Sequence, residues 1–242
     1  MKLKSKFTQA FYYAVTVLIT PIMLIQVIWV KLTVLRLPEP SGNRSGLCGD
    51  GVKLKLLIIG DSAAAGVGVD EQKDALAGQL TVTLAAKYEV NWCLIANTGF
   101  TSSDIIKELT VLREQTFDYV LVSVGVNDVT HLTRSDHWST NIKTIIELLD
   151  TKFKAPNVLL TSVPPMQQFT AIPAPLRWWV GLRAKRLNEL MTSATKDKNH
   201  YSILTFDLPF KPAFIAKDGI HPSKLAYNLW ANQAATKIDK LS

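Results

Sequence analysis

Cysteine and charge are both scarce in this sequence. Two cysteines in 242 residues, Cys48 and Cys93, are too few for a disulfide framework and too far apart for a C-x-x-C motif. Charged residues make up 19% of the chain and hydrophobic residues 48%, so the chain is more apolar than an ordinary soluble domain. The length suits one α/β domain with a short extension better than two full-sized domains.

Charge is missing altogether from residues 7–30, "FTQAFYYAVTVLITPIMLIQVIWV". The run exceeds the roughly 20 residues that a helix needs to cross a bilayer, and no small-residue cleavage pattern follows it. The sequence therefore predicts an uncleaved transmembrane helix within an N-terminal membrane anchor, residues 1–35. Lys2, Lys4 and Lys6 precede the run, which favours a cytoplasmic N-terminus. We expect a bacterial inner-membrane protein whose main body lies in the periplasm.

Arginine-rich helices and basic runs with interleaved aromatics are also absent, so the formal net charge of +7 does not indicate nucleic-acid binding. A basic surface suits an anchored protein because it is attracted to anionic lipid headgroups. The alternative is an ordinary solvated surface. No cluster of His, Cys, Asp and Glu has metal-ligand spacing, so the sequence does not imply a metal.

Residues 36–52 are rich in Pro, Gly and Ser, which is typical of a flexible linker, and a globular domain is expected over residues 53–242. Short apolar runs alternate there with longer amphipathic stretches. The predicted strands cover residues 55–59, 89–95, 119–124, 157–161 and 202–206. The predicted helices cover residues 74–87, 102–113, 136–151, 175–196 and 223–239. This alternation favours a three-layer α/β/α sandwich with a mainly parallel sheet, whose ligands bind at the carboxyl ends of the strands.

The first predicted strand runs into "GDSAAAG", residues 60–66. A phosphate loop and a dinucleotide fingerprint are excluded, because no G-x-x-x-x-G-K-[ST] occurs in the chain and this turn lacks G-x-G-x-x-G. Ser62 is then a candidate nucleophile, which needs a base and a group that orients the base. Asp218 and His221 meet that need, since their spacing lets one turn present both side chains. The alternative for His221 is a hydrogen-bonded structural histidine.

Acyl transfer also needs hydrogen-bond donors that face the developing oxyanion. The candidates are the backbone N–H of Ser62, the N–H of Gly99 and the side-chain amide of Asn127, each in a loop that follows a predicted strand. The alternatives are that Gly99 only makes a turn and that Asn127 caps the next helix.

Four blocks taken together resemble the motifs of the GDSL-type, or SGNH, hydrolases. They are GDS with a glycine four residues after the serine, N-x-G-x-T, G-x-N-D and D-x-x-H-P, in this order and over nearly the whole chain after the linker. The resemblance implies a flavodoxin-like sheet of five strands in the order 2-1-3-4-5 and no cofactor. It also implies a site made of the triad Ser62, Asp218 and His221 and an oxyanion hole of Ser62, Gly99 and Asn127.

Two neighbours of the serine qualify this resemblance. Ala63 stands where the family often has leucine, which leaves the chemistry intact but weakens any inference about the substrate. Ala64 stands where the G-x-S-x-G elbow of an ordinary α/β-hydrolase needs glycine, so that family is excluded.

Other residues have less defined roles. Asp61 and Asp128 are expected to brace their loops, and His131 and His137 to lie at the surface. For residues 164–191 two alternatives stand. In one, the first half walls the acyl pocket while Trp178, Trp179 and the basic residues lie near lipid headgroups. In the other, an amphipathic helix packs both tryptophans in the core.

The sequence therefore favours a membrane-anchored serine esterase that hydrolyses carboxylic esters through an acyl-Ser62 intermediate. Its expected partners are a small-molecule or lipid ester and the membrane. Alternatives with the same chemistry are a thioesterase or lysophospholipase, and a deacetylase of cell-envelope carbohydrate. The alternative outside the enzymes is an inactive interaction protein of the same fold, against which the complete set of site residues argues.

Overall fold

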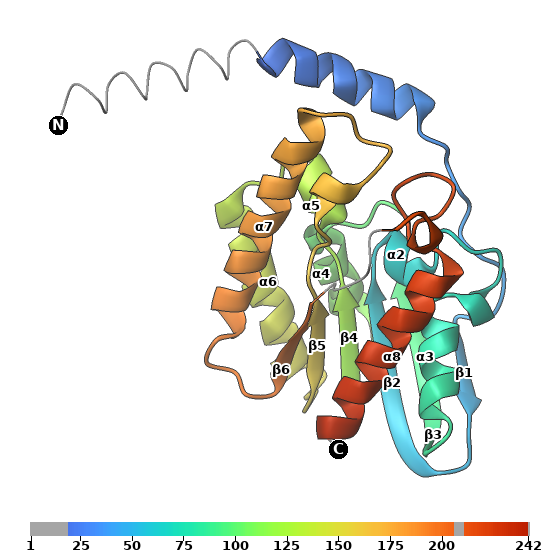
Figure 1. Ribbon diagram of the computed structural model, residues 1–242. Helices are drawn as coiled ribbons and strands as arrows, with labels where there is room; N and C mark the ends of the chain where they lie inside the picture. Colours follow the sequence, from blue (N-terminus) through green and yellow to red (C-terminus); the bar gives the residue numbers. More distant parts are fainter. Residues whose placement is uncertain (1–18, 206–210, 242) are drawn as a thin grey trace.

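The computed structural model describes residues 19–205 and 211–241, and its centre is a mixed sheet of six strands (Figure 1). The strands are β1 (Ser45–Cys48), β2 (Val52–Gly60), β3 (Tyr88–Ala96), β4 (Tyr119–Ser123), β5 (Val158–Thr161) and β6 (Tyr201–Leu204). Their order is β1-β3-β2-β4-β5-β6. Strands β2 to β6 are parallel, and their order corresponds to the 2-1-3-4-5 arrangement expected from the sequence.

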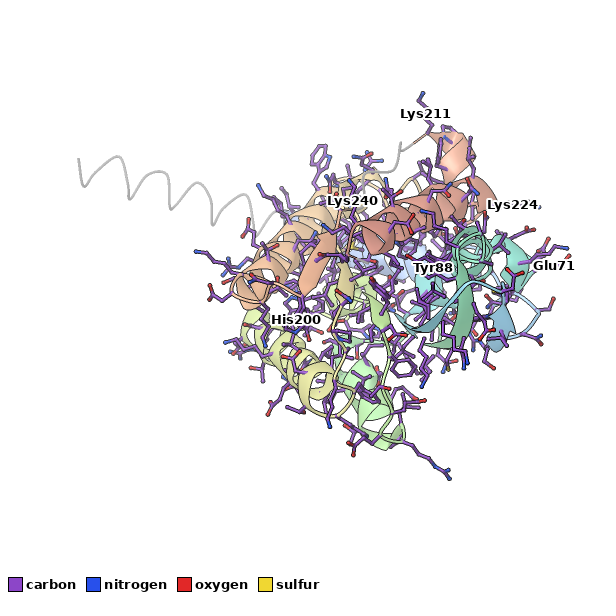
Figure 2. All side chains as sticks on the ribbon, turned by 90° about the horizontal axis from the view of Figure 1, so that it is seen from below. Glu71, Tyr88, His200, Lys211, Lys224 and Lys240 are labelled. Carbon is purple, nitrogen blue, oxygen red and sulfur yellow. The ribbon has the colours of Figure 1, made fainter. Side chains whose placement is uncertain are left out.

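Helices cover both faces of the sheet, as the alternating pattern predicted. They are α2 (Ser62–Ala65), α3 (Leu76–Leu84), α4 (Ser102–Val111), α5 (Val126–Thr130), α6 (Ser135–Thr151), α7 (Leu176–Thr195) and α8 (Lys224–Leu241). Short 3₁₀ turns cover Gln72–Asp74, Met166–Gln168 and Pro212–Phe214. Helices α3 and α8 pack together on one face, and α4, α6 and α7 on the other. Seen from below, side chains fill both layers between the helices and the sheet (Figure 2).

Strand β2 shows why the sheet is buried on both sides. Side chains of a strand alternate between the two faces, and Leu56 and Ile58 belong to the core beneath α3 and α8. Leu57 and Ile59 belong to the opposite core, and all four are completely buried. The continuous apolar run that a doubly covered parallel strand needs is therefore present.

The prediction of a five-stranded sheet was wrong by one strand. The sixth, β1, lies within residues 36–52, where the sequence predicted a flexible linker, and it pairs antiparallel with β3 from Ser45 opposite Cys93 to Cys48 opposite Val90. Its four residues, SGLC, carry no period-2 apolar pattern, because an edge strand gains its order from the neighbour's backbone rather than from burial.

Upstream of β1, residues 19–33 form a helix, called here the N-terminal helix. The predicted transmembrane run, residues 7–30, lies partly within this helix, and residues 7–18 lie outside the described residues. No helix within residues 19–205 and 211–241 is long and apolar enough to cross a membrane. The membrane anchor at residues 1–35 stays a prediction. The last residue of the predicted strand 202–206 also lies outside the described residues.

Trp138 provides a test of the packing between α6 and α7. Its indole is fully buried, and its Nε1–H donates to the carbonyl oxygen of Leu187 at 3.0 Å. Trp138→Ala should lower the free energy of unfolding by about 3–5 kcal/mol, because it leaves a cavity in the core. The control Val111→Ala, at a side chain that is 76% exposed, should change it by less than about 0.5 kcal/mol. Urea denaturation measures the free energy of unfolding of both variants. A Trp138→Ala variant as stable as the wild type would contradict this packing.

Candidate active site

The loops that follow the three central strands meet at one edge of the sheet. Gly60, the last residue of β2, is paired with Ala96 of β3 on one side and with Ser123 of β4 on the other. A Cβ at Gly60 would lie 2.3 Å from the carbonyl oxygen of Ser123, so only glycine fits this position. The close approach sets Asp61 and Ser62 between the loop after β3 and the loop after β4.

Three side chains predicted from the sequence are joined by hydrogen bonds at this edge. The hydroxyl of Ser62, the first residue of α2, lies 2.8 Å from Nε2 of His221, although the two are 159 positions apart. Nδ1 of His221 lies 2.5 Å from Oδ2 of Asp218. Oδ1 of Asp218 accepts from the backbone N–H groups of Ile220 and His221, each at 3.0 Å. One turn thus presents both residues, as their spacing suggested.

The charge of Asp218 decides the direction of these bonds. Burial by itself would raise the pKa of this carboxyl group, but the hydrogen bond and charge of His221, with two backbone N–H groups, outweigh burial and hold the pKa below 3.8. An ionised carboxylate only accepts hydrogen bonds, so Nδ1 of His221 carries the proton. When Nε2 carries no proton it accepts a hydrogen bond, and Ser62 then donates its hydroxyl hydrogen to it.

Gly99 lies in the loop after β3, and Asn127 lies in the first turn of α5, which follows β4. Gly99 has φ +91°, which favours glycine, and a Cβ there would meet nothing within 4 Å. The backbone N–H groups of Ser62 and Gly99 make no hydrogen bond to any residue that the structure describes. The Asn127 amide donates to the carbonyl oxygen of Phe100 at 2.9 Å, which ties the two loops together and leaves its second hydrogen for another acceptor.

Asp128 braces its loop, as expected. It is fully buried, and its two oxygens accept from the backbone N–H and the hydroxyl of Ser102 at 2.9 and 2.6 Å. Asn141 donates to the same hydroxyl at 2.8 Å, so α4, α5 and α6 are joined behind Asn127. His131 and His137 are exposed, as predicted.

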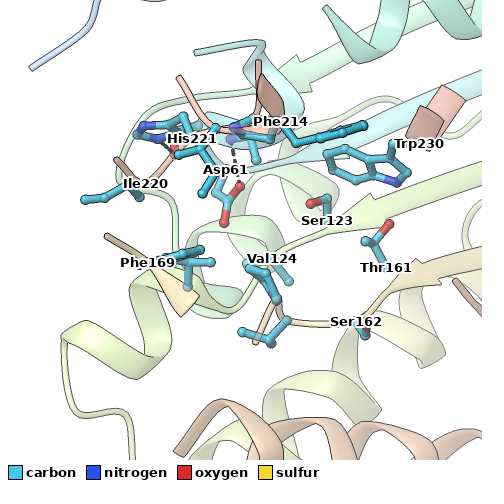
Figure 3. Close-up of a pocket in the computed structure, with 17 residues that line it drawn as sticks. Asp61, Ser123, Val124, Thr161, Ser162, Phe169, Phe214, Ile220, His221 and Trp230 are labelled. Atoms are coloured by element: carbon cyan, nitrogen blue, oxygen red, sulfur yellow. Dashed lines mark hydrogen bonds between the residues drawn. The ribbon is translucent and has the colours of Figure 1, made fainter. Parts of the chain in front are cut away.

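A cavity of about 50 Å³ opens beside Ser62 and His221 (Figure 3). Its walls come mostly from the loops after β4 and β5 and from the turn before α8. They are largely apolar and include Val124, Val163, Phe169, Ile220 and Trp230. No group of three or more His, Cys, Asp or Glu side chains within the described ranges is placed to hold a metal ion.

The profile of the GDSL-like Lipase/Acylhydrolase family matches residues 58–229. The chain belongs to this family. As a member of an acylhydrolase family, the protein is a hydrolase of ester bonds. A search of curated proteins found no significant match.

Solved structures share the fold of this family member. The psychrotrophic esterase EstA from Pseudoalteromonas sp. is 21% identical, with a TM-score of 0.61 over 77% of this chain and 97% of that chain. A lipase/acylhydrolase from Enterococcus faecalis is 22% identical, with a TM-score of 0.58 over 77% and 96%. An acetyl xylan esterase from Geobacillus stearothermophilus is 17% identical, with a TM-score of 0.59 over 78% and 95%. At these identities the likeness shows the fold alone.

Residues 164–191 of this acylhydrolase combine features of both alternatives. Pro164 and Phe169 line the cavity, so the first half of the segment does form part of its wall. Trp179 is half-buried against the core, with the guanidinium carbon of Arg183 5.2 Å from its ring centre. Trp178 is 60% exposed and lines a separate open groove, which shares Pro164 with the cavity wall. The two tryptophans therefore have different surroundings, which spacing alone did not reveal.

Glu39 contacts the site and was not found from the sequence. Its Oε1 accepts from the backbone N–H of Thr98 at 2.6 Å and from the Thr98 hydroxyl at 2.8 Å, beside Gly99. Its Oε2 is paired with Arg44 at 3.1 Å. Glu39 lies in the segment expected to be a linker, where a single acidic residue gives no signal of this contact.

Asp61 has a larger part than a loop brace. Its Oδ1 accepts from the backbone N–H of Ala63 at 3.1 Å and caps α2, while the residue, only 2% exposed, also lines the cavity. Burial raises the pKa of Asp61 from 3.8 to about 6, although the N–H of Ala63 and the charge of His221 lower it in part. The buried carboxylate next to the serine therefore costs stability once it is ionised.

Asp61→Asn tests this cost. A carboxyl group whose pKa is raised in the folded state binds its proton more tightly there, so the wild-type protein loses stability as pH rises from about 4 to about 6. The neutral amide still caps α2 but does not ionise. The stability of the variant relative to wild type should therefore increase by about 2 kcal/mol between pH 4 and pH 7 in urea denaturation. A difference independent of pH would contradict the raised pKa.

Proposed function

We propose that this protein is a membrane-bound serine esterase that cleaves esters of short carboxylic acids through an acyl-Ser62 intermediate. The observation that carries the proposal is the continuous hydrogen-bonded chain from Asp218 through His221 to Ser62 beside an apolar cavity. A serine hydroxyl becomes a competent nucleophile when an oriented base takes its proton, and this chain supplies both parts.

The reaction consists of two displacements. Ser62 Oγ attacks the ester carbonyl carbon while its proton moves to Nε2 of His221. His221 then gives that proton to the departing alcohol, and the acyl group stays on Ser62. Water, deprotonated by the same nitrogen, attacks the acyl carbon, and the serine recovers its proton as the acid leaves. Asp218 holds the imidazole in the tautomer that accepts from Ser62 and stabilises the imidazolium that forms.

The proposed oxyanion hole consists of the N–H groups of Ser62 and Gly99 and the amide of Asn127. Two of these donors have no partner among the described residues, and the third has a hydrogen to spare, so all three can bind the oxygen that becomes negative. Removing one such donor typically slows turnover by about 10²- to 10³-fold.

The cavity favours a short acyl group. One water molecule takes up roughly 10–15 Å³ of such a cavity, so a cavity of about 50 Å³ holds roughly three to five groups of that size. An acetyl group fits, which favours deacetylation within the alternatives considered. A panel of acetylated glycans, acyl thioesters and lysophospholipids separates deacetylase, thioesterase and lysophospholipase activities on the same triad.

Membrane attachment belongs to this proposal. It is supported by the uncharged run at residues 7–30. The exposed apolar side chains of the N-terminal helix agree with attachment, because a water-soluble domain gains nothing from them.

Ser62→Ala is the direct test. Turnover of 4-nitrophenyl acetate should fall by about 10⁴-fold or more, since the acyl intermediate cannot form. Thermal stability should stay close to wild type, and the control Ser135→Ala, at an exposed serine on α6, should keep full activity. Retained activity in Ser62→Ala would overturn the assignment of the nucleophile.

A further inference from the structure

The N-terminal helix is fastened to the catalytic domain along one side. Met23 and Val27 pack against the core that lies under α7. Between them, Gln26 Nε2 donates to the carbonyl oxygen of Ala174 at 2.6 Å, and the Leu176 N–H donates to Gln26 Oε1 at 3.0 Å. Figure 1 shows the helix lying across the end of the domain to which the carboxyl ends of the parallel strands point. This is the end that holds the active site.

The opposite side of the N-terminal helix is apolar and uncovered within the part of the chain that the structure describes. The exposed apolar side chains there and just after the helix are Ile22, Leu24, Ile25, Ile28, Trp29, Leu32 and Leu35, which are 49–81% exposed. At about 100° per residue the six that belong to the helix lie within an arc of about 160°. Lys31, at the border of this arc, is the only charged residue in the helix. A helix that is apolar on every side is normally buried on every side.

We propose that this outer face is a lipid-contacting surface, which holds the active-site end of the enzyme against an anionic bilayer. Residues 7–18, which precede the helix in the sequence, are also uncharged, so a membrane-seeking stretch adjoins it. Trp29 is the residue type that favours the lipid–water interface. Lys31 and Arg36, at the end of the helix and just beyond it, suit anionic headgroups.

The exposure pattern places the helix parallel to the membrane surface. Ile28, Leu32 and Leu35 continue the outer face to the end that joins the domain, and a helix along the bilayer normal would leave them in water. A parallel helix buries the whole arc at the headgroup boundary. A straight crossing by residues 7–30 would instead pull Met23 and Val27 off the protein.

The placement of the N-terminal helix on the membrane surface indicates a substrate class. This inference rests on the proposed esterase function. The active-site end faces the bilayer, and the cavity takes a short acyl group. The geometry fits an acetyl-type ester whose alcohol is an amphiphile held in the membrane.

The test compares one ester in two settings. The full chain is added to phosphatidylcholine–phosphatidylglycerol vesicles that contain the acetate of a nitrophenol with a hexadecyl chain, and separately to soluble 4-nitrophenyl acetate. The double variant I25D/L32D puts charges on the outer face and should lower vesicle-ester turnover by at least about tenfold. Its soluble-ester turnover should stay within about twofold of wild type. The matched control is Val111→Asp, an exposed apolar residue at the far end of α4, which should change neither rate.

Each other outcome has a separate meaning. If the wild type does not cleave the soluble ester, the proposed function fails. If it does, and I25D/L32D cleaves the vesicle ester as fast as wild type, the lipid-contacting surface is wrong while the esterase assignment stands. A wild-type dimer by light scattering without lipid, made monomeric by I25D/L32D, would assign the outer face to a second copy of the chain and overturn the proposal.

A second inference has its own observation. We infer that Glu39 is a positioning residue for the Gly99 N–H. One carboxylate oxygen binds both the N–H and the hydroxyl of Thr98, the residue before Gly99, and the other oxygen is held by Arg44. The loop that carries Gly99 is exposed, so this clamp limits the directions in which its free N–H can point.

Kinetics distinguish positioning from simple packing. Glu39→Ala should lower kcat on soluble 4-nitrophenyl acetate by about 10- to 100-fold with little change in KM, because a misplaced donor acts on the transition state. Glu39→Gln, which keeps an oxygen acceptor, should recover most of that loss. Arg44→Ala keeps the Thr98 bonds but releases the second carboxylate oxygen, so its kcat should fall by less than that of Glu39→Ala. An unchanged kcat in Glu39→Ala, or no recovery by glutamine, would overturn this role.

Discussion

The hydrogen bond between Ser62 and His221 is the contact on which the account of this molecule depends. It joins the end of the second strand to the turn before the last helix, across 159 positions of sequence. It forms only if β2 ends in the middle of the sheet and α8 packs beside α3 on the same face. The proposed chemistry therefore depends, as stability does, on the parallel sheet and on the layer that α3 and α8 form.

The two carboxyl groups near this contact, those of Asp218 and Asp61, have pKa values shifted in opposite directions. Hydrogen bonds and the neighbouring imidazole favour the ionised form of Asp218, while burial disfavours the ionised form of Asp61, one residue from the serine. A carboxylate that orients the proposed base must carry charge, whereas a carboxyl group buried against the proposed nucleophile is costly when charged. The surroundings of Asp218 therefore stabilise its charged form, and burial destabilises the charged form of Asp61.

Much of this arrangement could be predicted from the sequence, because its signals are local. The five parallel strands and five long helices follow from apolar periodicity, and the proposed triad follows from a serine after a strand and a D-x-x-H pair. Strand β1 and Glu39 could not be predicted in this way. Strand β1 is ordered by pairing with the backbone of β3, and Glu39 contacts the site through Thr98. Neither contact produces a recognisable pattern in the sequence around β1 or Glu39. The different surroundings of Trp178 and Trp179 likewise depend on how α7 packs as a whole.

The central claim is that Ser62 is the nucleophile, and covalent labelling tests it most directly. The intact protein is treated with a fluorophosphonate, whose phosphorus bonds to the attacking oxygen as fluoride leaves, and the digest is examined by mass spectrometry. The account predicts one adduct, on Ser62, which is lost when His221 is replaced by alanine. A protein that stays unlabelled while it cleaves esters, or one labelled at another residue, would contradict it.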